Sequence, residues 1–330
     1  MKRRFVSLIC GYYGMGNLGD ELLLAAVLKE LESVGVDRDR VAVLSGDTKG
    51  TSSLHGVAAF DRWSLPEVWR ACRSSRNCLF GGGGLFQDVT SFRSVLYYGG
   101  VVAISRAAGC SPWLFGNSLG PFRSCFGRRI SSLALRACSV VALRDDHSMA
   151  EAGRMGIPAR RCPDPVMSLN VPQGRGDSLL VNLRPWDGDL EFRAAGAIAD
   201  YAERKGFPVV GVAMCGQDRD LLDRLDKDGI LPVYNVVEPK GADDSVWAAG
   251  FASIGMRLHF CLLSSLAGLS GTAIPYDPKV VDFGRSVGYP LWDGVGSFPD
   301  PEAPNRGWID RCRKGVSETF RDSWREVFRG

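Results

Sequence analysis

The chain has 330 residues, of which 45% are hydrophobic and 23% charged, as in an ordinary globular protein. Its length fits two α/β domains better than a single core. A formal net charge of only +3 excludes a polyelectrolyte that binds nucleic acid with its whole surface. No apolar run approaches the length of a membrane span.

The cysteines and histidines argue against a metal protein. The ten cysteines form no CxxC pair, and the three histidines form no tight cluster with them. We therefore expect no metal and no cofactor. Reduced, mostly buried thiols are expected instead, as in a cytoplasmic protein.

The first half of the chain alternates short apolar strands with amphipathic helices, which predicts a parallel sheet. The opening segment is charged and then briefly apolar, and we expect a first strand there rather than a signal peptide. Strands are expected at residues 4–10, 41–44, 77–80, 113–115 and 140–143, with helices at 20–33, 92–108 and 130–137.

A Pro- and Gly-rich stretch, residues 163–176, interrupts this rhythm and predicts a linker. The alternation then restarts with expected strands at 178–183, 208–212, 232–236, 253–256 and 272–275, and helices at 191–205, 218–227 and 260–266. The spacing of Val316, Phe320, Trp324 and Val327 predicts a last amphipathic helix. The pattern predicts an α/β protein with domains at 1–170 and 171–312 and a C-terminal helix at 313–330.

Two glycine-rich loops follow expected strands. Gly14, Gly16 and Gly19 match the GxGxxG pattern of dinucleotide-binding proteins. The carboxylates of Asp20 and Glu21, however, stand where a pyrophosphate would bind the helix start. These two residues are either favourable partners of the helix dipole or catalytic groups.

The second loop is a run of four glycines, residues 81–84, followed by Leu85, Phe86, Gln87 and Asp88. Because consecutive glycines are costly to order, we expect a loop whose backbone amides approach a ligand. A tight turn is the alternative. The fourth expected strand ends in another polar turn, residues 116–121.

Four cations follow strand ends: Arg144, Arg184, Arg257 and Lys279. Because ligands of parallel sheets bind beyond the carboxyl ends of the strands, we expect a cleft between two Rossmann-like halves to hold a multiply charged anion. His259, two residues after Arg257, is expected to be a general acid. His55, expected in a loop, and His147, near a helix start, are expected to be surface or capping residues.

The ordered motifs GYYGMGNLGDE, GGGGLFQDVTSFRSVLYY, RDDHS, DPV, MRLH and YDPKV resemble the bacterial polysaccharide pyruvyl transferases over about residues 5–285. The resemblance is greatest to the branch that pyruvylates secondary cell-wall polymers for S-layer anchoring. Two departures concern the acceptor side: Gly84 stands where serine is frequent, and residues 117–120 stand where QGIG is frequent.

The resemblance implies a fold like the GT-B glycosyltransferases, with two Rossmann-like domains facing a cleft and a C-terminal helix packing back on the N-terminal domain. It implies phosphoenolpyruvate as donor and a pyruvate ketal as product. The implied acceptor is N-acetylmannosamine on a polyprenyl-diphosphate-linked oligosaccharide, used in the cytoplasm at the inner membrane face. The N-terminal domain is expected to face the acceptor and the C-terminal domain the donor.

In the matching RLH motif, Arg257 is implied to bind phosphoenolpyruvate, next to Leu258, and His259 to be the acid. We infer that Arg184, Arg144 and Lys279 share the donor. Asp20, Glu21 and Asp88 are candidates for the base. The backbone loops expected to meet the acceptor contain the residues Gly14, Asn17, Gly82, Gly83 and Gln87.

A basic and aromatic zone, Phe122–Arg129, predicts either contact with a lipid diphosphate or the anionic inner leaflet, or simply a solvated helix start. Two other activities fit the sequence. One is a nucleotide-sugar glycosyltransferase on the same architecture, and the other is an NAD(P)-dependent oxidoreductase, which rests on the GxGxxG pattern alone.

Overall fold

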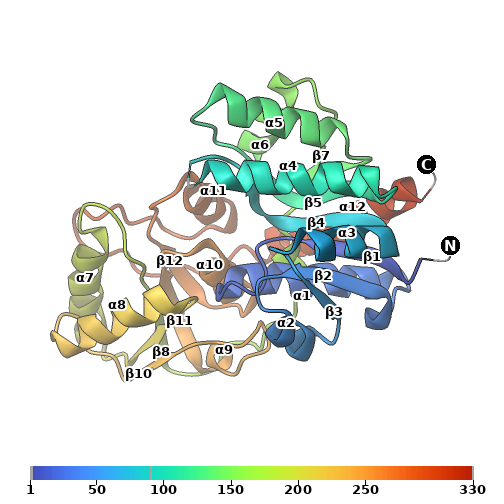
Figure 1. Cartoon of the computed structure of the whole chain (residues 1–330). Coiled ribbons are helices and arrows are strands. Elements are labelled where there is room, and N and C mark those ends of the chain that lie inside the picture. Colours follow the sequence, from blue (N-terminus) through green and yellow to red (C-terminus); the bar gives the residue numbers. More distant parts are fainter. Residues whose placement is uncertain (1–2, 90, 329–330) are drawn as a thin grey trace. The chain divides into compact units, whose positions relative to one another are not determined.

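The computed structural model describes residues 3–89 and 91–328, which cluster into two compact units (Figure 1). Unit 1 comprises residues 3–15, 20–89, 91–168 and 312–328. Unit 2 comprises Gly16–Gly19 and Leu169–Arg311. Each unit is a parallel sheet with helices. Among the described residues, no helix combines the length and the apolar character that crossing a bilayer requires.

Unit 1 contains a seven-stranded sheet in the order β3-β2-β1-β4-β5-β6-β7, with every pair parallel. All six residues of β1 are buried, as expected for a strand covered on both faces. The strands are β1 (Phe5–Cys10), β2 (Val41–Ser45), β3 (Ala58–Asp61), β4 (Ser75–Phe86), β5 (Ser111–Leu119), β6 (Val141–Leu143) and β7 (Arg160–Arg161).

The helices of this half follow the strands, as in a doubly wound fold. They are α1 (Leu18–Ser33), η1 (Arg38–Arg40), α2 (Thr48–His55), α3 (Leu65–Ser74), α4 (Phe92–Ala107), α5 (Cys125–Arg136), α6 (Asp146–Arg154) and η2 (Pro165–Ser168). Side-chain caps fix several starts: Asp145, for example, accepts a hydrogen bond from the backbone of Ser148 at the start of α6.

The C-terminal helix α12 (Arg306–Val327) returns to unit 1, as the sequence predicts. The ring of Phe320 packs on Phe115 at 4.9 Å and on Trp113 at 5.6 Å between centroids. Ser317 of the same helix donates a hydrogen bond to Glu30 of α1 (3.0 Å). Aromatic burial of this kind makes α12 part of the core of unit 1.

Unit 2 contains a five-stranded parallel sheet in the order β10-β9-β8-β11-β12. Its strands are β8 (Ser178–Asn182), β9 (Val209–Val212), β10 (Asn235–Val237), β11 (Gly250–Gly255) and β12 (Ser270–Ala273). Its helices are α7 (Leu190–Lys205), α8 (Gly216–Lys227), α9 (Val246–Ala249), α10 (Leu258–Leu266) and α11 (Pro278–Val287). The two Rossmann-like sheets confirm the predicted α/β class.

The glycine run is the main correction to the expected elements. Residues 81–84 do not form a loop after the strand, because β4 continues through them to Phe86. Gly82 and Gly83 have φ of 75° and 79°, and the pairing register with β5 shifts after Gly83. The neighbouring strand therefore supports a bulge that only glycine adopts without strain.

Other elements differ in extent or were not expected. β5 includes Gly116–Leu119, which was expected to be a turn, and β10 lies at Asn235–Val237 rather than at 232–236. The sequence analysis did not predict α2, β3, α3 or β7. β3 and β7 are short strands that exist through pairing with their neighbours β2 and β6. α3 is amphipathic, with Val68, Ala71 and Cys72 buried, so its spacing was a signal that could have been used.

Candidate functional site

The carboxyl ends of three adjacent strands of unit 2 carry the predicted donor-binding residues. Asn182 at the end of β8 pairs with Gly255 at the end of β11, and Gly255 pairs with Ala273 of β12. Arg184 follows β8, Arg257 follows β11, and the segment leading to Lys279 follows β12. The sheet order therefore brings these strand ends to one edge, where ligands of parallel sheets bind.

Arg257 is held by a bidentate ion pair with Asp218 of α8. Its Nε donates to Oδ2 and its Nη2 donates to Oδ1, both at 2.6 Å, and Nη2 also lies 2.9 Å from the sulfur of Cys215. Burial alone would lower the pKa of Arg257, but the ion pair with Asp218 outweighs it and raises the pKa. These bonds leave Nη1 as the nitrogen that can bind an anionic ligand.

Asp218 is itself fixed by a buried network. It is fully buried, and its Oδ2 accepts hydrogen bonds from Asn182 Nδ2 and from the backbone of Met214, each at 3.2 Å. Asn182 Oδ1 in turn accepts from the backbone N–H of Arg257 (3.0 Å). Both the backbone and the guanidinium of Arg257 are therefore positioned by side chains on neighbouring strands and helices.

Arg184 lies in an aromatic setting at the same edge. Its guanidinium carbon lies 4.6 Å from the ring centre of Tyr276 and 5.1 Å from that of Trp186. These two rings pack edge-to-face at 4.7 Å. The two rings therefore position the guanidinium of Arg184 by cation–π contact.

His259 lies in the first turn of α10, next to Leu258, and its ring packs against the loop Gly16–Gly19. A Cβ placed on Gly19 would come within 2.3 Å of His259 Nδ1. The loop is attached to unit 2 because Leu18 N–H donates to the carbonyl of Met214 (2.9 Å) and Asn17 bridges to Cys215. Gly19 is therefore required by the imidazole.

Hydrogen bonds to the backbone also fix Asn17 and Lys279 in place. The side-chain oxygen of Asn17 accepts a hydrogen bond from the backbone of Gly19 (3.0 Å), which fixes the turn beneath the imidazole. Lys279 lies in the first turn of α11, where its backbone N–H donates to the N-cap residue Asp277 (2.9 Å).

Glu21, a candidate base in unit 1, has both carboxylate oxygens engaged. Oε1 accepts from the backbone of Gly14 (2.8 Å), and Oε2 lies 3.1 Å from Nε2 of His55. His55 was expected in a surface loop or as a cap, and that expectation is wrong. It ends α2 and is buried against Glu21. His147 is exposed near the start of α6, as expected.

Asp88 orders the segment that leads into α5. Its carboxylate accepts hydrogen bonds from the backbone of Arg123 and from both the backbone and the hydroxyl of Ser124. Burial would raise the pKa of Asp88, but these hydrogen bonds outweigh it and hold the pKa below its usual value. Gln87 accepts from the backbone of Val89 (2.9 Å). Both side chains stabilise local backbone.

Asp20 lies beside the glycine bulge of β4. A Cβ on Gly83 would lie 3.6 Å from Asp20 Oδ1, and one on Gly82 would come within 2.6 Å of Leu23. Asn117 donates its amide to the carbonyl of Gly82 (2.6 Å). The structure therefore brings together three predicted residues, Asp20, Gly82 and Gly83, within unit 1.

Arg144 belongs to unit 1, and its guanidinium is already paired. Its Nη1 lies 2.6 Å from Oδ2 of Asp164 in the DPV motif, and its Nε donates to Ser118 Oγ (2.8 Å). Ser118 in turn donates to Asp145, the N-cap of α6 (2.6 Å). Burial would raise the pKa of Asp145, but the hydrogen bonds from Ser118 and Ser148 lower it.

An aromatic cluster around Arg62 was missed by the sequence analysis. Arg62 is buried just after β3 and donates to the carbonyl of Gly11 (2.7 Å), in the loop after β1. Its guanidinium carbon lies 4.7 Å from the ring centre of Tyr97, 5.0 Å from Trp63 and 5.4 Å from Tyr12. Tyr12 and Trp63 are exposed. This cluster forms an aromatic platform at the carboxyl edge of the unit 1 sheet.

The cysteines and acidic residues offer no gathered ligand set among residues 3–89 and 91–328. All ten cysteines are free thiols, and Cys10, Cys72, Cys78, Cys110, Cys162 and Cys261 are buried. Burial raises the pKa of Cys261 to about 12. The buried thiols therefore pack as small apolar side chains.

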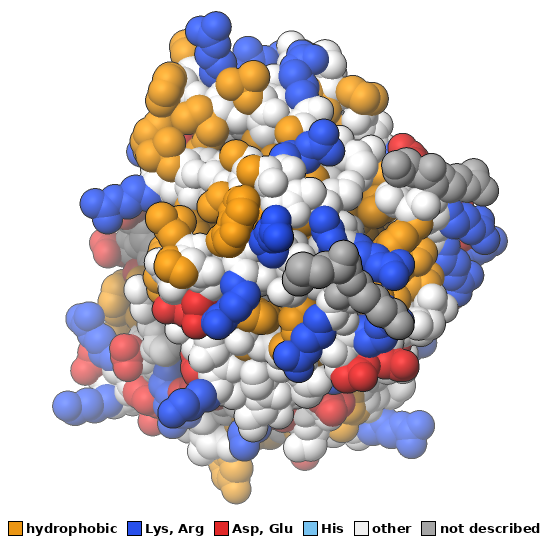
Figure 2. All heavy atoms as spheres, turned by 45° about the vertical axis from the view of Figure 1, so that its right-hand side comes forward, with side chains coloured by type: hydrophobic (Ala, Val, Ile, Leu, Met, Phe, Trp, Pro, Cys, Tyr) orange, Lys and Arg blue, Asp and Glu red, His pale blue; other side chains and the backbone are white. Residues whose placement is uncertain are grey.

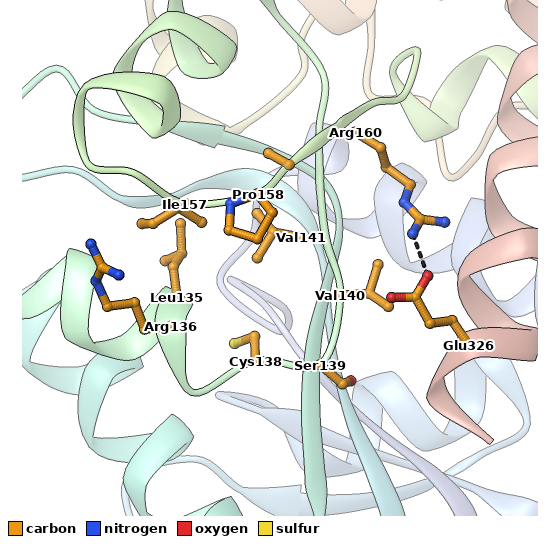
Figure 3. A pocket seen from close by; sticks show the side chains of 11 residues that line it. Leu135, Arg136, Cys138, Ser139, Val140, Val141, Ile157, Pro158, Arg160 and Glu326 are labelled. Carbon is orange, nitrogen blue, oxygen red and sulfur yellow. Dashed lines mark hydrogen bonds and ion pairs between the residues drawn. The ribbon is translucent and has the colours of Figure 1, made fainter. Parts of the chain in front are cut away.

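A pocket of about 420 Å³ opens in unit 1, and its lining contains none of the candidate site residues (Figure 3). Figure 3 shows the ion pair of Arg160 with Glu326 at one side and Arg136 at the other. Of the lining residues, Val141 is the first of β6 and Val140 precedes it, so the pocket is at the amino edge of that strand. Ligands of parallel sheets bind at the opposite edge.

Comparisons with known proteins agree with this architecture. Residues 17–278 match the sequence model of the family described as polysaccharide pyruvyl transferase. No curated protein matches the chain.

Solved structures with similar folds include a glycosyltransferase from Rickettsia africae ESF-5 (TM-score 0.56, 10% identity, covering 98% of this chain and 94% of that one). A UDP-GlcNAc 2-epimerase from Methanocaldococcus jannaschii has a TM-score of 0.55 and 9% identity, covering 94% and 92%. A ugt transferase from Siraitia grosvenorii in complex with UDP has a TM-score of 0.52 and 12% identity, covering 98% and 100%. At these identities the likeness shows a GT-B-like fold alone.

Proposed function

Because the chain belongs to the polysaccharide pyruvyl transferase family, we propose that it transfers the pyruvyl group of phosphoenolpyruvate to a sugar as a ketal and releases phosphate. The observation that carries this proposal is the guanidinium of Arg257, held at two nitrogens by Asp218 beside the imidazole-bearing first turn of α10. A fixed cation and a nearby acid are what a charged enol donor requires.

The donor is bound, in this proposal, by residues of unit 2. Arg257 binds the carboxylate or phosphate through Nη1, and Arg184 and Lys279 supply further positive charge. The guanidinium of Arg257 is pre-positioned, so little side-chain freedom is lost when the donor binds. Arg144 was predicted to share this task. Its ion pair with Asp164 supports a role in holding the DPV segment of unit 1.

In the reaction, protonated His259 gives its proton to the methylene carbon of phosphoenolpyruvate, which becomes a methyl group. The neighbouring carbon gains positive character, and one sugar hydroxyl attacks it. Phosphate then leaves, and a second hydroxyl of the same sugar closes the ketal. Of the two hydroxyl protons lost, one replaces the proton that His259 gave and the other leaves with phosphate.

Three carboxylates remain candidates for the base. Those of Glu21 and Asp88 accept hydrogen bonds from backbone, and Glu21 also contacts the buried His55. Asp20 lies beside Gly83 of the bulge.

We further propose that the acceptor is a sugar, with N-acetylmannosamine of a polyprenyl-diphosphate-linked cell-wall glycan as the first candidate. This assignment follows the S-layer-anchoring branch, places the enzyme in the cytoplasm at the inner membrane face and requires no cofactor. The aromatic platform of Tyr12, Trp63 and Tyr97 supports the acceptor assignment, because the exposed rings of Tyr12 and Trp63 at the strand edge offer an apolar face for a sugar ring.

The experiment supplies phosphoenolpyruvate and a synthetic polyprenyl-diphosphate-linked disaccharide that contains N-acetylmannosamine. One phosphate should be released for each ketal formed. His259→Ala should still bind phosphoenolpyruvate and lose about 10²- to 10⁴-fold in turnover. His147→Ala, at an exposed position, is the matched control. Near-normal turnover by His259→Ala, or nucleotide release from a UDP-sugar instead of phosphate release, would contradict the proposal.

A further inference from the structure

One segment of unit 1 has an unusual charge. Residues 91–143 contain six arginines, Arg93, Arg106, Arg123, Arg128, Arg129 and Arg136, and none of the chain's 37 acidic residues. The segment thus carries a formal charge of +6, whereas the whole chain carries +3. Its positive charge is therefore not balanced within the segment, which contains α4, β5, α5 and β6.

The two helices pack side by side (Figure 1). A Cβ on Gly99 of α4 would lie 3.0 Å from Ile130 of α5, so the two helices are in close contact there. The rings of Phe92 and Phe126, at the starts of the two helices, lie 5.8 Å apart and are both exposed, so they lie at the rim of this contact. The outer faces of the two helices include this rim.

The outer faces are apolar where a surface helix is normally polar. On α5, Phe126 is 62% exposed and Leu133, two turns later, is 65% exposed. On α4, Phe92 and Leu96 are exposed one turn apart. Figure 2 shows hydrophobic and basic side chains gathered at the top of the molecule, where α5 is drawn in Figure 1. We call these four residues the apolar face.

The arginines beside the apolar face differ in how far they are neutralised. Arg128 is paired with Glu151 of α6, so its charge is compensated. Arg93, Arg123 and Arg129 are exposed, and Arg136 is exposed while donating to the carbonyl of Met155. Exposed arginines next to exposed Phe and Leu side chains form the pattern of a helix that lies in a membrane interface.

We propose that α4 and α5 dock unit 1 onto an anionic lipid bilayer. Phe126, Leu133, Phe92 and Leu96 enter the headgroup boundary, and Arg93, Arg123 and Arg129 contact anionic headgroups. A second copy of the chain is the wrong occupant, because pairing this face with itself would oppose like charges. A polyprenyl-linked acceptor is reached at a bilayer, so the purpose of this docking rests on the proposed function.

The test is co-sedimentation of the full chain with vesicles of phosphatidylcholine alone or with added phosphatidylglycerol. Binding should require phosphatidylglycerol and weaken as salt is raised. Vesicle binding should weaken about tenfold or more in each of two double variants, Phe126→Ser/Leu133→Ser and Arg123→Gln/Arg129→Gln. For the arginine pair, the loss is roughly fivefold per arginine. The matched controls are Tyr234→Ser/Val295→Ser and Arg224→Gln/Lys227→Gln, at exposed positions of unit 2.

Three outcomes would overturn the proposal. The wild type could bind neutral and anionic vesicles equally, or the α4 and α5 variants could bind as the wild type does. Light scattering could instead show a dimer that Phe126→Ser/Leu133→Ser converts to a monomer without any change in vesicle binding. Because none of these measurements requires turnover, loss of vesicle binding and loss of pyruvyl transfer can be told apart.

Discussion

Replacement of Asp218 by Asn tests whether this buried carboxylate positions Arg257. The change keeps the side-chain volume but removes the charge that accepts from Nε and Nη2 of Arg257, each at 2.6 Å. An amide cannot accept both bonds, so the guanidinium loses at least one charge-assisted hydrogen bond. Such a bond contributes about 1.5–3 kcal/mol. If this ordering is lost, phosphoenolpyruvate affinity should fall by about 10- to 150-fold.

The assay is a calorimetric titration with phosphoenolpyruvate, which requires no acceptor. A positioning role predicts that Asp218→Asn and Arg257→Lys do not add: the double variant should bind about as weakly as Arg257→Lys alone. Asp300→Asn is the matched control, because Asp300 pairs with Lys205 at an exposed site of the same unit (3.0 Å).

Oδ2 of Asp218 also accepts two further hydrogen bonds, which Asn keeps only where its single oxygen takes the Oδ2 position. The thermal midpoint of the unliganded variant must therefore be measured beside the titration. A folded Asp218→Asn protein with unchanged affinity would refute the reasoning. Additive losses in the double variant would show that Asp218 and Arg257 act independently, which would also contradict a positioning role.

Three further changes test other parts of the account. Gly19→Ala would place a methyl group within 2.3 Å of His259 Nδ1. We expect turnover to fall while phosphoenolpyruvate binding persists. Gly216→Ala is the control, and it should leave turnover unchanged because the space around Gly216 is open. Trp63→Ala should raise KM for the sugar acceptor about tenfold or more without changing the affinity for the donor. Initial rates measured at varied acceptor concentration test this. An unchanged KM would show that the aromatic platform is not part of the acceptor site. Burial raises the pKa of Glu30, so the folded state holds the proton of this carboxyl more tightly than the unfolded state does. The wild type therefore loses stability as pH rises through and above the ordinary Glu pKa. Glu30→Gln should therefore raise the thermal midpoint at about pH 8 and have little effect at about pH 4, and an equal effect at both pH values would contradict this sign.

The sequence was sufficient for the architecture because strand and helix periodicities are local properties. It was not sufficient where pairing with a neighbouring strand determines the conformation of the backbone. The four glycines at residues 81–84 look like a loop by composition, but β5 pairs with them and turns them into a bulged strand. The short strand β3 likewise exists through its pairing with β2.

The candidate site likewise contains residues that the local sequence can indicate and residues that it cannot. Arg257 and His259 could be proposed as site residues from the sequence because they follow a strand directly in a recognisable motif. Asp218 and Asn182 gain their roles only from sheet order, which places β8 between β9 and β11. An Asp in the first turn of α8, just past the end of β9, was the available signal. His55 was wrongly placed at the surface because its partner Glu21 lies on a different helix.

The central claim is that phosphoenolpyruvate, and not a nucleotide, is the donor. The most direct measurement is the thermal unfolding midpoint of the full chain with phosphoenolpyruvate, UDP-GlcNAc or NAD. A ligand at about 100 times its Kd stabilises the folded state by about 2.7 kcal/mol, a rise of several degrees. Phosphoenolpyruvate should raise the midpoint, and Arg257→Lys should reduce that rise. A rise with UDP-GlcNAc or NAD and none with phosphoenolpyruvate would contradict the account.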